Sequence, residues 1–147
     1  MLKKLLNKDT IKLDIVANDW KEAIFKGCEI LLDKGYIEKK YIDSIIKNIE
    51  ENGPYIVITK GVAFPHSKPE DGVNHLAMSL VTLKEPVYFG HEQNDPVRLV
   101  ITLAAVDSNT HLSALSKFIS LLRSSEDIEK IINSKTKEEV IKIIEKF

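Results

Sequence analysis

The chain's most apolar run is Val97-Arg98-Leu99-Val100-Ile101-Thr102-Leu103-Ala104-Ala105, in which Arg98 carries the single charge. The run is far shorter than the roughly 20 apolar residues that a membrane-spanning helix needs. A short, continuous apolar run of this kind is typical of a strand that is buried on both faces of a sheet. We therefore expect the central strand of a covered sheet here.

The segments on either side of this run alternate between strand and helix patterns. Further strands are expected at 11–16, 55–58, 76–83 and 87–89, where apolar residues alternate with polar ones or β-branched residues cluster. Apolar residues at helical spacing predict helices within 20–31, 42–49, 107–122, 124–132 and 136–147, the third of which can begin at Asp107-Ser108-Asn109-Thr110. The Gly- and Pro-rich stretch 59–72 predicts a loop. The expected fold class is α/β, with a mixed β-sheet covered by helices on both faces.

Length and composition favour one ordinary globular domain over 1–147. The formal net charge of −1 gives no strong field to attract a nucleic acid or a membrane surface. The single cysteine, Cys28, cannot form an intramolecular disulfide, which favours a reducing compartment. The first ten residues hold no apolar run of signal-peptide length, and we expect a cytoplasmic protein.

His66 is the strongest candidate for a chemical role. It lies in the predicted loop directly after Pro65, whose ring fixes its own φ and stiffens the backbone that enters His66. A histidine with an ordinary pKa of about 6.5 is mostly neutral at physiological pH, so its ring nitrogen can attack phosphorus. The alternative is a histidine that merely caps a turn.

His111 lies in the first turn of the helix predicted to follow the central strand. Backbone N–H groups and the helix dipole favour an anion at that place, so His111 could donate to a phosphoryl group held on another histidine. Asn109 and Thr110 are possible further donors, and Ser67 and Lys68 directly follow His66. The alternatives are that His111 is an exposed residue of the first turn and that Lys68 is a solvated surface charge.

The remaining candidates carry weaker signals. His75 and His91 fall beside a strand and in a polar loop, and both are interpreted as surface residues. Cys28 falls on the apolar stripe of a predicted helix and is expected in the core. The sequence has neither metal-ligand spacing nor a nucleotide-binding glycine pattern, so we expect no metal and no cofactor.

The motif Gly61-Val62-Ala63-Phe64-Pro65-His66 resembles the mannitol/fructose-type IIA domain of the phosphoenolpyruvate-dependent phosphotransferase system. The segment 103–112, which ends in His111-Leu112, resembles the part of that family that carries its second histidine. The stretches 66–73, 83–87 and 104–107 resemble the ascorbate-specific branch most. One feature departs from the mannitol-type pattern, because the region from Asn48 to Tyr55 lacks the arginine that supports the active site there.

The resemblance implies a mixed sheet between helices and a phosphotransferase component that forms a phosphohistidine at His66, with His111 bonding the phosphoryl group. It implies the histidine-containing phosphocarrier protein as donor, a IIB component as acceptor and, indirectly, the membrane IIC transporter. Both soluble partners must reach His66, so Val62 and Phe64 are expected at the rim or floor of a shallow depression, or in the core.

Two other functions remain open from the sequence. One is a regulatory phosphoacceptor of the nitrogen-type IIA kind, whose phosphorylation state controls a partner. The other is a hydrolase that uses His66 and His111 as base and acid, although it lacks a convincing nucleophile or metal. The ascorbate-like stretches favour transport.

Overall fold

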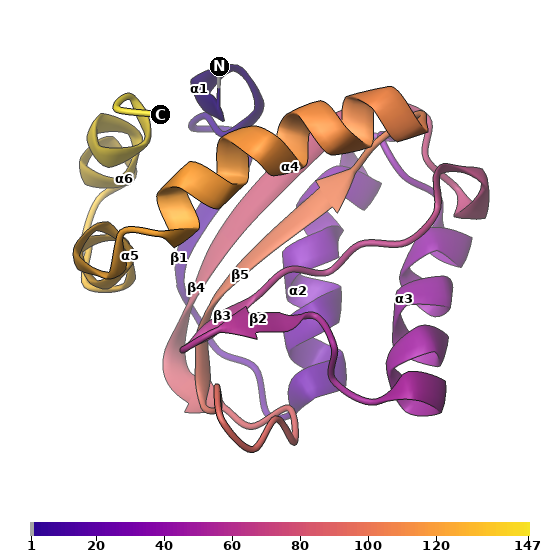
Figure 1. The fold of residues 1–147 in the computed structure, drawn as a ribbon, viewed down its shortest axis with the longest axis horizontal. Coiled ribbons are helices and arrows are strands. Elements are labelled where there is room, and N and C mark those ends of the chain that lie inside the picture. The colour runs from indigo at the N-terminus through magenta and orange to yellow at the C-terminus, as the bar shows by residue number, and fades with distance from the viewer. Residues whose placement is uncertain (1) are drawn as a thin grey trace.

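Five strands form one open sheet in the order β1-β4-β5-β3-β2 (Figure 1). A computed structural model describes residues 2–147, so Met1 of the expected domain 1–147 lies outside the described residues. The strands are β1 (Ile11–Ile15), β2 (Val57–Thr59), β3 (Val62–Ala63), β4 (Ala77–Val87) and β5 (Val97–Ala104). Pairs β1/β4 and β3/β5 are parallel, whereas β4/β5 and β2/β3 are antiparallel. The predicted central strand is therefore confirmed as β5, the middle strand of a mixed sheet.

Helices cover both faces of this sheet, as the sequence predicted. Helices α2 (Trp20–Asp33) and α3 (Lys39–Asn52) pack on one face. The other face carries α1 (Leu2–Leu5), α4 (Ser108–Leu122), α5 (Ser125–Ile132) and α6 (Lys137–Ile144). Alternate residues of β5 enter the two cores, with Val100 and Ala104 on the α2 side and Ile101 and Leu103 on the α4 side. The α/β class is confirmed.

Side-chain caps explain where several helices begin. The Asp19 carboxylate accepts the Glu22 N–H at 2.8 Å at the start of α2, and the Thr136 hydroxyl accepts the Glu139 N–H at 3.2 Å at the start of α6. Such caps satisfy backbone donors that have no partner inside the helix. The predicted starts of both helices are confirmed.

Helix α2 lies unusually close to the centre of the sheet. A Cβ atom at Gly27 would lie 2.8 Å from Cγ1 of Val100, so only glycine fits there without a shift. The buried Ser79 hydroxyl on β4 donates to the Gly27 carbonyl oxygen at 2.5 Å and fastens the same turn of α2.

The structure differs from the expected elements in three places, the first of which is helix α1, in a segment where no element was expected. The stretch 59–72 is not all loop, because it contains β3 and a 3₁₀ turn at Pro69–Asp71. Residues 77–87 form one strand where two were expected. The register of β4 against β5 shifts between Thr82 and Val87, so Pro86, which has no N–H, falls where the regular pairing is interrupted.

The parallel pairing of β3 with β5 decides which segments meet. Val62 and Ala63 lie opposite Leu99 and Val100, so both strands point their carboxyl ends toward the same edge. The loop after β3 carries His66, and the turn after β5 leads into α4. In open α/β sheets this edge is where ligands bind. No helix within residues 2–147 is both long and apolar enough to cross a membrane.

Candidate active site

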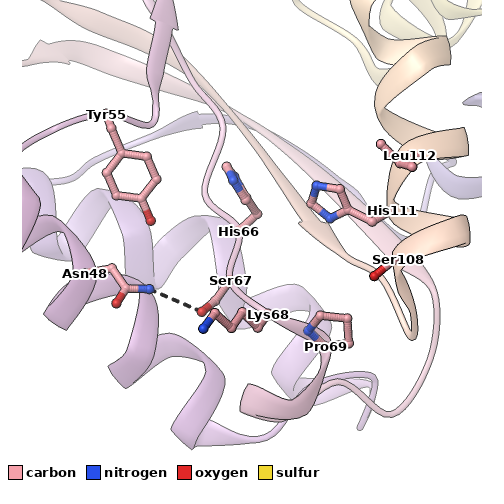
Figure 2. A pocket seen from close by; sticks show the side chains of 9 residues that line it. All are labelled: Asn48, Tyr55, His66, Ser67, Lys68, Pro69, Ser108, His111 and Leu112. Atoms are coloured by element: carbon pink, nitrogen blue, oxygen red, sulfur yellow. Dashed lines mark hydrogen bonds between the residues drawn. The ribbon is translucent and has the colours of Figure 1, made fainter.

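A groove opens at this edge of the sheet, with a volume of about 450 Å³. Three segments line it: α3 with the turn that follows it, the loop after β3, and the first turns of α4 (Figure 2). The lining residues are Asn48, Tyr55, His66, Ser67, Lys68, Pro69, Ser108, His111 and Leu112. The structure thus brings together four of the predicted site residues, including both candidate histidines.

His66 is half-buried, and one of its ring nitrogens is already bonded. Nδ1 lies 2.7 Å from the carbonyl oxygen of Phe64. A carbonyl oxygen can only accept, so Nδ1 carries the proton and Nε2 keeps its lone pair in the neutral ring. Phe64 is itself buried and stacks on Phe118 of α4, with ring centroids 4.6 Å apart. Val62 and Phe64 are therefore core residues, which confirms the second of the two expected placements. The ring centroids of Phe64 and His66 are 5.2 Å apart.

The ring of His111 faces that of His66 across the groove (Figure 2). Their centroids are 5.6 Å apart, with an interplanar angle of 58°. Burial lowers the pKa of His66, and the neighbouring His111 lowers it further, while the bond to Phe64 opposes both. The ring of His66 is thus kept in the neutral form that a nucleophile needs.

Ser67 is held by bonds on two sides. Its hydroxyl donates to Oδ2 of Asp71 at 2.5 Å and accepts from the Asn48 amide at 3.3 Å (Figure 2). The hydroxyl proton therefore points at Asp71 and not into the groove. Lys68 is exposed and is the lysine among the residues that line the groove.

Asn109 and Thr110 lie outside the groove lining. Thr110 completes the cap of α4, because its N–H donates to the Asp107 carboxylate at 2.7 Å and its hydroxyl donates to the Asp107 carbonyl at 3.1 Å. Asn109 is exposed in the same turn. In this part of α4 the groove is lined by Ser108 together with His111.

The other candidate residues lie away from the groove. His75 is exposed and packs against Tyr36, and the half-buried His91 accepts the Asn94 N–H through Nδ1 in the loop before β5. Cys28 is fully buried, and burial raises the pKa of its thiol to about 12. The interpretation of Cys28 as a core residue is confirmed.

Sequence reasoning missed several groove residues. Tyr55 places the edge of its ring toward His66, with centroids 6.1 Å apart, and Asn48 reaches in from α3. Both lie in the region where the family resemblance raises the question of a supporting arginine. The missing arginine indicated that this region borders the site. Asn and Tyr are too common at protein surfaces, however, for either residue to be selected as a site residue from the sequence.

Known proteins of one family resemble this chain in both sequence and structure. Residues 4–147 match the family described as "Phosphoenolpyruvate-dependent sugar phosphotransferase system, EIIA 2". The chain belongs to this family. Among its relatives, the ascorbate-specific PTS system EIIA component of Escherichia coli (strain K12) is 38% identical over 143 residues, which cover 97% of this chain and 93% of the relative.

Solved structures of this EIIA family agree in fold. The mannitol-specific cryptic phosphotransferase enzyme IIA of Escherichia coli is 35% identical, with a TM-score of 0.90 and 99% of each chain covered. Mannitol IIA of the same organism, solved as a complex with phosphorylated IIB, is 25% identical with a TM-score of 0.84, covering 97% of this chain and 100% of that one. The chain is thus a type 2 EIIA component of the phosphotransferase system, with the mannitol/fructose-type fold.

Proposed function

We propose that this EIIA component takes a phosphoryl group onto Nε2 of His66 from the histidine-containing phosphocarrier protein and passes it to a cognate IIB component. The observation that carries the proposal is the pairing of the two histidines in the groove, with Nδ1 of His66 bonded to Phe64 and its other nitrogen free. On the way in, a bond forms between Nε2 and phosphorus while the bond from phosphorus to the donor's nitrogen breaks. Onward transfer repeats these steps with IIB as acceptor.

The groove offers several groups that can stabilise the phosphoryl charge. His111 donates a ring N–H to a phosphoryl oxygen, and the first turn of α4 presents the positive end of its dipole. Lys68, two residues after His66, adds a basic side chain that is exposed at the groove. The hydroxyl of Ser67 plays a structural part, because its proton goes to Asp71.

Within the described residues, no arginine lines this groove. On its α3 side the lining residues are Asn48 and Tyr55, which are both neutral. Asn48 uses one N–H on Ser67 and keeps a second for a phosphoryl oxygen. Neutral donors bind a dianion less strongly than a guanidinium does. A less tightly held phosphoryl group suits a carrier that must release it to the next protein.

Both partners need the same face, because one nitrogen cannot meet two proteins at once. Tyr55 and Leu112 flank the groove with exposed apolar side chains, 44% and 63% accessible. An interface built on them is expected to be small, at or below about 1,200 Å² in total, as transient complexes are. The ascorbate-specific EIIA relatives favour a transport role, in which a IIC transporter in the membrane receives the phosphoryl flow indirectly through IIB, over a purely regulatory one.

The test is to incubate the protein with phosphoenolpyruvate, enzyme I and the phosphocarrier protein, and then to map the labelled residue. We expect one phosphoryl group at His66, none in His66→Ala, and full labelling of the matched control His75→Ala. Adding IIB should drain the label from the wild type. Stable labelling of His66→Ala at another histidine would refute the proposal.

A further inference from the structure

The buried hydroxyl of Tyr41 takes no direct part in the reaction proposed above, yet it joins the segments that carry the two histidines. Tyr41 lies on α3, and its side chain is fully buried. Its oxygen accepts the Ser67 N–H at 2.9 Å and lies 2.7 Å from the carbonyl oxygen of Leu103, to which it donates. Burial raises the pKa of Tyr41, so the hydroxyl keeps this proton at any physiological pH.

Each partner of Tyr41 is next to a functional segment. Ser67 directly follows His66. Leu103 is near the end of β5, from which the chain continues through a short turn into α4 and His111. One hydroxyl therefore bonds both segments, and the Leu103 N–H adds a direct bond to the Pro65 carbonyl at 3.0 Å.

Helix α3 contacts Ser67 a second time. Asn48 lies seven residues after Tyr41, two turns further along the same face of the helix, and donates to the Ser67 hydroxyl. The backbone and the side chain of Ser67 are thus both held by α3. Ser67 is only 9% exposed, so water does not readily replace a lost partner.

We propose that Tyr41 is a positioning residue for phosphoryl transfer, because its hydroxyl sets the spacing between the His66 loop and the strand that leads to His111. This role rests on the proposed function. Transfer depends on reacting groups that are held in place, and a shift of about 1 Å can slow a reaction by ~10²-fold. Without the hydroxyl, the Ser67 N–H is left buried with no acceptor, and the loop shifts to find one.

The test compares Tyr41→Phe with Ser79→Ala in the full chain. Ser79 is a matched control, because it is also fully buried and also donates a hydroxyl to a backbone carbonyl, that of Gly27 on α2, and it neither lines the groove nor contacts Ser67. Both variants should melt at a lower temperature than the wild type. Tyr41→Phe should lower kcat for transfer to IIB by ~10-fold or more, with KM for both partners within about twofold, because Tyr41 is not on the docking face. Ser79→Ala should keep both constants.

A spectroscopic readout separates positioning from stability. In Tyr41→Phe, the imidazole nitrogen signals of both His66 and His111 should shift, whereas in Ser79→Ala they should stay in place. A full transfer rate in Tyr41→Phe, or an equal loss of rate in Ser79→Ala, overturns the positioning role alone. A wild-type protein that takes no label refutes the proposed function, and the positioning role with it.

A second variant covers the case in which Tyr41→Phe does not fold. Asn48→Ala removes the other α3 contact with Ser67 from a half-exposed side chain, so no buried group is left unpaired. Because Asn48 is also a proposed donor to the phosphoryl group, the readout that reports positioning is a shift of the His66 and His111 imidazole nitrogen signals in the unphosphorylated variant, together with a fall in kcat while KM is kept. Transfer by Asn48→Ala at the wild-type rate would show that α3 does not position the loop and would overturn the proposal.

Discussion

Nδ1 of His66 donates its proton to the carbonyl oxygen of Phe64 over a distance of 2.7 Å. Because this bond belongs to the backbone of the same loop, it persists whatever partner approaches from outside. It fixes both the tautomer and the ring orientation, as the second bond of a histidine commonly does at functional sites. The nitrogen of His66 that can react can therefore be named.

The first prediction concerns which nitrogen is phosphorylated. Nε2 is the nitrogen with a free lone pair, so the phosphoramidate should form there. Phosphorus and nitrogen NMR of the phosphorylated protein distinguishes the two isomers. A phosphoryl group on Nδ1 would contradict the tautomer, because it would require the bond to Phe64 to break first.

The second prediction concerns pH. Burial, assisted by His111, lowers the pKa of His66 from its ordinary value of 6.5 in the folded state. His66 should therefore titrate below pH 6.5, and phosphoryl acceptance should persist to lower pH than a free imidazole allows. Because the unfolded chain takes up this proton first, the free energy of unfolding should fall as the pH drops below about 6.5, and His66→Ala should remove that part of the fall. Ring-proton NMR, assigned with His66→Ala, gives the midpoint, and a value at or above 6.5 would contradict us.

The third prediction concerns the second histidine. His111→Ala leaves the nucleophile and its bond to Phe64 intact, so acceptance from the phosphocarrier should continue. Onward transfer to IIB should slow by ~10²-fold, the usual contribution of a positioned acid or donor. Single-turnover transfer from the phosphorylated variant measures this directly. Equal rates in the variant and the wild type would mean that the 5.6 Å approach of the two rings has no catalytic role.

The fourth prediction concerns docking. Leu112→Ser removes an exposed apolar side chain from the rim and should raise KM for both partners roughly tenfold, about 1.4 kcal/mol, while kcat is kept. Tyr88→Ser is the control, because Tyr88 is 70% exposed and follows the end of β4 at the opposite end of the sheet from His66. An increase in KM for only one partner would show that the two proteins dock on different faces. The same increase in Tyr88→Ser would place the interface elsewhere.

Sequence patterns predicted the sheet and most of the helices, because periodicity is a local signal, whereas the pairing of His66 with His111 in one site was predicted from the family resemblance. Strand β3 was missed because two residues are too few for a periodic pattern. The strand break expected near Pro86 was wrong, since β4 continues past an interruption in its pairing. Asn48 and Tyr55 were missed because their place in the groove depends on how α3 packs, which no local pattern encodes.

The strand order also has a consequence for how a new chain matures on the ribosome. β5 is the last strand in the sequence, yet it joins the β1-β4 pair to the β2-β3 hairpin. During synthesis these two parts lack their common neighbour until residue 104 has emerged, and such long-range pairing forms slowly. The segment that follows is α4, with the second histidine. A ribosome that stalls before α4 therefore holds a chain that has His66 but neither a finished sheet beneath it nor a partner imidazole across from it.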